Sequence, residues 1–164
     1  MERVLVVLDY FNFQEGIIKK YGEFNYNFFL EYLSNLEEGR KLIDAYGYIK
    51  LDYYDENTKM EEINIIEANG FLIKRKINYS REDIENNFYE TSIIIEILKT
   101  VKELNIEIVV FLTRNTIYYP LFKYLRDIGI RVEIASIENF ENEKLNGISQ
   151  GIISVDEFLM EKEV

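Results

Sequence analysis

Apolar residues along the chain follow two kinds of spacing, and each kind predicts a type of secondary structure. Val4–Leu8 and Ile108–Leu112 are continuous apolar runs, which are typical of strands buried on both faces of a parallel sheet. Other segments carry apolar residues at the spacing of amphipathic helices: 25–36, 60–69 and 117–128. These segments are followed by Gly39, Gly70 and Gly129, and glycine is common just after a helix.

The remaining segments continue an alternation of strands and helices. We expect strands over 40–51, 71–76, 130–135 and 148–153, a short helix over 140–146 and a helical tail from Val155. Ser80 has the hydroxyl of a helix cap, and the helix after it reaches Leu104, with Asn86 and Asn87 as a candidate break. This alternation predicts one domain over 1–164, an α/β three-layer sandwich whose central, mainly parallel sheet is Rossmann-like. Its two most apolar strands, the first and the fourth, are expected to be central neighbours.

Polar residues follow both of these apolar strands. Asp9 ends the first run, and Thr113, Arg114 and Asn115 follow the second. In open parallel sheets the carboxyl ends of the strands meet at one edge, and ligands collect there. We therefore expect these side chains to lie side by side in a candidate site.

The helix after the third predicted strand adds acids near the same edge. Ile94, Ile97 and Val101 form an apolar stripe, and Glu90 stands one turn before it. A carboxylate in such a buried position needs a cation, a metal or hydrogen-bond donors. Glu96 is close in sequence but points about 120° away around the helix.

Composition restricts the chemistry that is available. The chain has neither Cys nor His, which excludes thiolate nucleophiles, disulfides, imidazole catalysis and thiolate or imidazole zinc sites. Carboxylates and amides remain, and these suit Mg²⁺ or Mn²⁺. The net charge of −11 opposes general attraction to nucleic acid but allows a local basic patch. No apolar run is long enough for a membrane span, so we expect a cytoplasmic protein without a membrane partner.

Each candidate residue also has a structural interpretation. Asp9 can cap a turn, Glu90 can belong to an ion pair, and Glu96 can be a solvated acid on a helix face. Asn115 can cap the following helix together with Thr116. The aromatic-rich stretches can stack on bases, form core, or join copies of the chain in a homo-oligomer.

The motifs together resemble the NYN domains, which are part of the PIN-like nuclease group. Asp9–Asn12 is similar to the family pattern Asp-Gly-x-Asn at the end of the first strand. Asn87–Glu90, followed by Glu96, falls at the spacing of Lys-Gly-x-Asp-(x)5-Asp. Thr113–Leu121, which contains the only proline, Pro120, corresponds to Ser-Gly-Asp-Ser-Asp-Phe-x-Pro-Leu.

This resemblance implies a metal-dependent ribonuclease ancestry. In the family, clustered acids hold Mg²⁺ or Mn²⁺, which activates water for the hydrolysis of RNA. On this resemblance we expect Asp9, Glu90 and Asn115 as catalytic groups and Asp9, Glu90 and Glu96 as metal ligands. We further expect Asn12, Thr113 and Arg114 as substrate-binding groups, Arg114 because an arginine can bind a phosphate.

The chain departs from the family pattern in its acids. Asn115 and Ile117 replace the acids of the fourth-strand motif, and Gln150 replaces a later one. Arg114 replaces a glycine, and its guanidinium can neutralise the acids where a metal would sit or grip a phosphate. The sequence thus predicts a PIN-like domain with weak or lost RNA hydrolysis. The alternative is a non-catalytic module that binds RNA, a nucleotide or a protein.

Overall fold

The structure, a computed structural model, describes residues 1–10, 12–14, 16, 22, 24–35, 39–50, 56–76, 80–136, 147–149 and 151–155. The strands are β1 (Glu2–Asp9), β2 (Arg40–Lys50), β3 (Leu72–Lys76), β4 (Ile108–Leu112), β5 (Arg131–Ser136) and β6 (Gly151–Ser154). The helices are α2 (Tyr26–Asn35), α3 (Glu56–Ala68), α4 (Arg81–Glu85), α5 (Phe88–Glu103), the short 3-10 helix η1 (Thr116–Tyr118) and α6 (Tyr119–Asp127). The predicted α/β class is confirmed.

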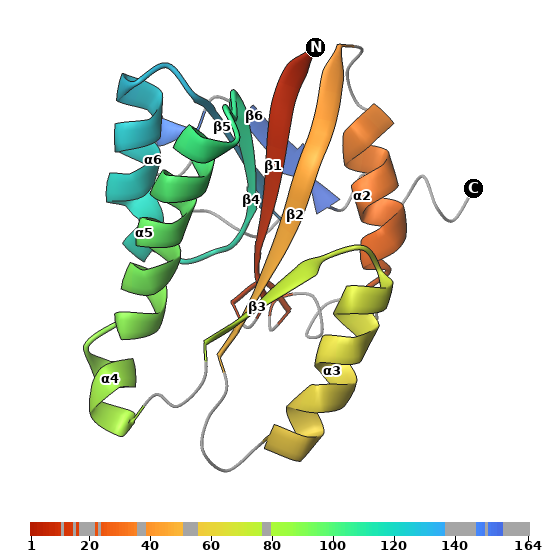
Figure 1. Ribbon diagram of the computed structural model, residues 1–164, viewed down its shortest axis with the longest axis vertical. Helices are drawn as coiled ribbons and strands as arrows, with labels where there is room; N and C mark the ends of the chain where they lie inside the picture. Colours follow the sequence, from red (N-terminus) through yellow and green to blue (C-terminus); the bar gives the residue numbers. More distant parts are fainter. Residues whose placement is uncertain are drawn as a thin grey trace.

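The strands form one parallel sheet in the order β3-β2-β1-β4-β5-β6. Helices α2 and α3 cover one face, and α5 and α6 cover the other, which completes the three layers (Figure 1). The predicted contact between the first and fourth strands is present, with Val4 opposite Ile108 and Leu8 opposite Leu112. From this central pair the chain winds outward in both directions, as in Rossmann-like sheets.

The apolar run of β1 supplies buried side chains to the core on both faces of the sheet. Val4, Val6 and Leu8 pack in the cluster on the α2 and α3 side, while Leu5 and Val7 pack against α5 and α6. Successive side chains of a strand point to opposite faces, so a strand between two helical layers needs apolar residues without alternation. The continuous run is the sequence signature of that position.

The break between α4 and α5 determines where Glu90 lies. Ser80 and Asp83 form a reciprocal capping box at the start of α4, with N···O distances of 2.9 and 3.1 Å. Asn87 then adopts a left-handed conformation with φ 59°, and α5 begins at Phe88. Because the helix restarts there, Glu90 lies in the first turn of α5, near the carboxyl edge of the sheet.

Some boundaries differ from the predictions. Helix α3 begins at Glu56 rather than Met60, because apolar spacing detects only the buried part of a helix. Strand β6 begins at Gly151, whereas Gly147 and Ile148 are helical. The predicted helices over 140–146 and after Val155 fall outside the described residues. Within the described ranges, no helix is long and apolar enough to cross a membrane.

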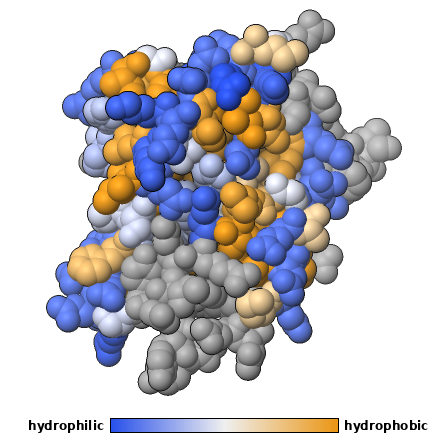
Figure 2. Space-filling view, viewed as in Figure 1, coloured by the Kyte–Doolittle hydropathy of each residue, from blue (hydrophilic) through white to orange (hydrophobic). Residues whose placement is uncertain are grey.

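Apolar surface remains at the β3 edge of the sheet. Strand β3 pairs only with residues 46–50 of β2, and Figure 2 shows apolar side chains on this face between the two helical layers. Leu72 of β3 and Ile95 of α5 are more than half exposed, at 51% and 63%. The homo-oligomer expected from the sequence stays a prediction.

A buried ion cluster links β2 to β5. Both guanidinium NH2 groups of Arg40 lie 2.7 Å from the carboxylate oxygens of Glu133, and Arg131 Nε donates to the same carboxylate at 2.6 Å. Burial raises the pKa of Glu133, but hydrogen bonds from Arg40 and Arg131 outweigh it and bring the pKa below its usual 4.5. Charged Glu133 therefore stabilises the fold.

We predict that Glu133→Gln lowers the free energy of unfolding at neutral pH by about 3–5 kcal/mol, because it leaves Arg40 buried without its counter-charge. A lowered pKa in the folded state contributes stability above the unfolded value of 4.5, and this contribution is lost as the pH falls through the folded value. The wild type and the variant should therefore converge in acid. Urea unfolding measured as a function of pH tests both statements.

The matched control is Glu103→Gln, which removes an exposed helical ion pair with Lys99, 3.8 Å long. Its cost should stay below about 0.5 kcal/mol. Equal losses for the two variants at neutral pH would contradict the importance of the buried cluster.

Candidate functional site

The candidate site lies at the carboxyl edge of the sheet, where β1 and β4 end side by side. Asp9 closes β1 and is 2% exposed, and Thr113 follows β4 and is fully buried. The chain leaves β1 toward β2 and leaves β4 toward β5 in the opposite direction (Figure 1). Ligands of open α/β sheets bind at such a switch point, so this edge is the first place to look for function.

Tyrosine hydroxyls surround the carboxylate of Asp9. Tyr118 of η1 donates a hydrogen bond to Oδ2 at 2.9 Å, and the hydroxyl of Tyr89 lies 3.4 Å from Oδ1. The Tyr89 hydroxyl also lies 2.8 Å from the backbone carbonyl of Tyr48. It carries a single hydrogen, so the shorter bond to Tyr48 takes most of its donating capacity, and Tyr118 is the stronger of the two tyrosine donors to Asp9.

Both tyrosines remain protonated at neutral pH. Burial raises the pKa of Tyr118 well above its usual 10.0, and the nearby Asp9 carboxylate raises it further. The pKa of Tyr89 is raised in the same way, first by burial and then by Asp9 and Glu90. The hydroxyls are therefore neutral hydrogen-bond donors, which is what a buried carboxylate needs in place of water.

Glu90 joins the same buried cluster from α5. It is 7% exposed, and its charge, like that of Asp9, contributes to the raised pKa of both Tyr89 and Tyr118. Ile93, Ile97 and Val101 are buried on the same helix, which confirms that Glu90 lies on the apolar face. Glu90 therefore lies near the two buried tyrosines whose hydroxyls face Asp9.

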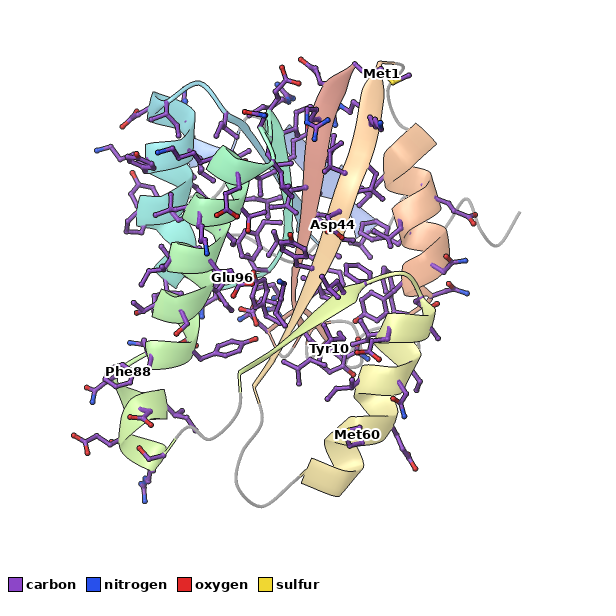
Figure 3. All side chains as sticks on the ribbon, in the orientation of Figure 1. Met1, Tyr10, Asp44, Met60, Phe88 and Glu96 are labelled. Carbon is purple, nitrogen blue, oxygen red and sulfur yellow. The ribbon has the colours of Figure 1, made fainter. Side chains whose placement is uncertain are left out.

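Glu96 lies in a different environment. Its carboxylate is 3.4 Å from Lys74 Nζ of β3, with both side chains partly exposed. Burial, followed by the charge of Glu96, raises the pKa of Tyr48. Figure 3 shows Glu96 on the side of α5 that faces the sheet. Glu96 is thus the acid of an ion pair with Lys74.

The side chain of Asn12 connects the segment after β1 to the loop after β4. Its Oδ1 accepts a hydrogen bond from the hydroxyl of Thr113 at 3.2 Å and another from the backbone N–H of Arg114. Thr113 Oγ1 accepts in turn from the N–H of Asn115 at 3.1 Å. Asn115 caps η1, because its Oδ1 accepts from the N–H of Ile117 at 3.1 Å. These polar side chains therefore shape the loop that carries Arg114.

Gly16 provides the surface on which Arg114 lies. A Cβ atom at Gly16 would be 2.5 Å from Nη1 of Arg114 and 3.1 Å from its Cδ, which is closer than side chains approach each other. The absence of a side chain at Gly16 thus allows the guanidinium to rest on the backbone. Arg114 is partly exposed, so this cation is held in place at the edge of the site.

The sequence profile of the NYN domain family matches residues 3–156. The chain belongs to the NYN domain family. This family is of the PIN-like nuclease type, and the NYN domain described here has the sheet expected of it. Its fold is similar to that of a protein of unknown function from Vibrio parahaemolyticus, with a TM-score of 0.70 and 14% sequence identity over 96% of this chain and 94% of that chain. The comparison with curated proteins gave no match.

PIN-like nucleases generally use divalent metals, and several of the oxygens at this site already accept hydrogen bonds within the protein. Among the residues that the structure describes, no three acidic side chains converge to hold a metal ion. Asp9 accepts from tyrosine hydroxyls, and the side-chain oxygens of Asn12 and Asn115 accept from the β4–η1 loop. Mg²⁺ prefers oxygen ligands in octahedral geometry, and in this NYN domain Asp9, Asn12 and Asn115 use side-chain oxygens for hydrogen bonds within the protein.

The tyrosines are the site residues that the sequence did not reveal. Tyr118 belongs to an aromatic-rich stretch for which stacking on bases, core and an interface were the alternatives, and its full burial agrees with the core interpretation. The sequence feature that could have identified Tyr118 is its position just after the Asn115 cap, because this cap turns the first residues of the next helix back toward the end of β1. Tyr89 stands beside Glu90 on the buried face of α5, and this neighbour relation was the corresponding signal.

We predict that Tyr118→Phe lowers the free energy of unfolding by about 1–3 kcal/mol, because a buried carboxylate loses its principal donor. Tyr124→Phe is the matched control on α6, since Tyr124 is 52% exposed, and its effect should stay within about 0.5 kcal/mol. Denaturant unfolding of the three proteins measures the difference. Equal stabilities of the two variants would contradict the proposed hydrogen bond.

Alkaline pH provides a second test. A raised pKa in the folded state means that the contribution of Tyr118 is complete below the unfolded value of 10.0 and declines as the pH rises above it. The wild type should therefore lose stability above pH 10.0, and Tyr118→Phe should lose less. Unfolding curves on either side of this pH measure the two slopes, and parallel slopes would contradict the assignment.

Proposed function

We propose that this NYN domain has lost metal-dependent RNA hydrolysis and acts as a non-catalytic module that binds single-stranded RNA at the carboxyl edge of its sheet. The observation that carries the proposal is the Asp9 carboxylate, which accepts from Tyr118 at 2.9 Å and is 2% exposed. In the family, the acid at this position helps to hold the metal. Here it is engaged inside the protein.

The loss of hydrolysis follows from the donor set. Hydrolysis of a phosphodiester needs a group that activates water and positive charge that stabilises the transition state. Asp9 is sealed from solvent, and the neighbouring tyrosines are neutral donors that do not take up a proton. At the positions of the fourth-strand acids, Asn115 serves as a cap and Ile117 is apolar. Of the acids that the family pattern places at the core of the site, Asp9 and Glu90 remain, and a metal is held more weakly as the number of charged ligands falls.

Arg114 supports the binding of RNA. Its guanidinium is the phosphate contact in this proposal, because a planar fork of donors suits a phosphate. Asn12 and Thr113 position the loop through their hydrogen bonds to it, and Gly16 supports the side chain. The net charge of −11 disfavours non-specific attraction to nucleic acid, so binding depends on this local contact.

We predict that single-stranded RNA binds to the protein at low salt and stays intact in the presence of Mn²⁺. Arg114→Gln should weaken binding by about tenfold, which corresponds to the loss of one charge-assisted hydrogen bond. The matched control is Arg126→Gln, which removes an exposed arginine from the last turn of α6 and should leave the affinity nearly unchanged. Fluorescence anisotropy of labelled RNA measures affinity, and gel electrophoresis measures cleavage.

Metal binding is tested separately by calorimetric titration of Mn²⁺ into the wild type and Asp9→Asn. We expect no binding heat in the millimolar range for either protein. Binding to the wild type that disappears in Asp9→Asn, together with cleavage of the RNA, would show that hydrolysis is retained and contradict the proposal. Absence of RNA binding at low salt would contradict its second half.

A further inference from the structure

A pocket of about 320 Å³ opens beside the candidate site, on the side of α3. Tyr10, which directly follows Asp9, forms part of its wall, and Figure 3 shows this residue at the carboxyl end of the sheet. The side chains that line the pocket are aromatic, aliphatic or amide groups: Tyr10, Gln14, Phe24, Tyr26, Ile65 and Ile66. None of them carries a formal charge.

The aromatic walls belong to the core and are therefore rigid. Tyr10 and Tyr26 are 6% and 3% exposed, and their ring centroids are 6.4 Å apart. Phe24 meets Tyr26 edge to face at 4.8 Å, and Tyr26 also contacts Phe71 at 5.9 Å. Rings held in this way keep the shape of the pocket wall when a ligand binds, which lowers the cost of binding.

Gln14 places a polar group at a fixed position in the pocket wall. Its Oε1 accepts a hydrogen bond from the hydroxyl of Tyr26, so the carboxamide is oriented by a buried residue. The NH2 group is then the part of the amide that can donate a hydrogen bond to a ligand. A ligand with a carbonyl or ring-nitrogen acceptor on its edge would match it.

These properties favour an uncharged, flat, aromatic ligand with polar edges. The lining residues that the structure describes offer no cation for a phosphate, and an aliphatic or phenyl side chain of a protein partner has no acceptor for Gln14. A nucleobase has both an aromatic face, which stacks on aromatic side chains, and acceptor atoms along its edge. Among these ligands, the nucleobase uses both features of the pocket.

The pocket and Arg114 border the same short segment after β1. Gln14 and Gly16 lie in the helical residues after β1, and the guanidinium of Arg114 rests on Gly16. We infer that the pocket is a nucleobase subsite, which takes one base of an RNA strand whose phosphate contacts Arg114. This inference deepens the proposed RNA-binding function and rests on it for the identity of the polymer.

The test combines a polymer and a free ligand. Gln14→Leu removes the amide donor with little change in size and should weaken binding of single-stranded RNA about fivefold, the effect of one neutral hydrogen bond. Asn64→Leu is the matched control, because Asn64 is an exposed amide on α3 outside the pocket lining. An abasic oligomer of equal length should bind the wild type more weakly than RNA does, independently of how well any variant folds. Uridine and adenosine, which lack phosphate, are titrated into the wild type and Gln14→Leu by calorimetry.

The outcomes separate the two proposals. Nucleoside binding that is weakened by Gln14→Leu supports the subsite, even if RNA fails to bind and thereby overturns the RNA function. RNA binding that is equal for the abasic oligomer and unchanged in Gln14→Leu overturns the subsite and leaves the RNA function standing. Binding of neither RNA nor nucleoside overturns both.

Discussion

The parallel pairing of β1 with β4 is the constraint on which the rest of this structure depends. It places Leu8 opposite Leu112, so Asp9 and Thr113 end at the same edge of the sheet. Because side chains alternate between faces, a shift of one residue would exchange the side chains of β1 between the two helical layers and move Asp9 away from Thr113. The register of this strand pair therefore determines the position of the site.

Burial of Asp9 is the main consequence of this arrangement. A carboxylate that is removed from water must be satisfied by donors or neutralised, and this NYN domain uses Tyr118 and, more weakly, Tyr89. A nuclease solves the same problem with metal ions, which leave coordination positions for water and substrate. The tyrosine donors of this NYN domain satisfy the carboxylate with neutral hydrogen bonds and bring no positive charge to the site. One architecture can hold sites of different chemistry, because function lies in the site rather than in the fold.

The edge of the site keeps features suited to binding. Asn12 accepts hydrogen bonds from the loop after β4, and Gly16 leaves room for Arg114. The positive charge is therefore held by local structure in a chain of net charge −11. Beside it, buried aromatic rings and the Gln14 amide form a neutral pocket. A nucleotide has a negative phosphate next to a flat aromatic base, so its two parts are complementary to a guanidinium beside a neutral aromatic pocket.

The sequence by itself determined the layers, the central strand pair and the likeness to NYN domains, because periodic apolar spacing and strand-end motifs are local properties. It also placed Glu90 on the apolar face of its helix. Only the tertiary structure decided which donors reach Asp9, since Tyr89 and Tyr118 come from separate helices and their convergence depends on the break at Asn87 and the Asn115 cap. The same holds for Glu96, which pairs with Lys74 of β3, and for Arg114, whose place depends on Gly16. Contacts between segments that are far apart in the sequence depend on tertiary packing. The spacing of apolar residues within one segment contains no information about them.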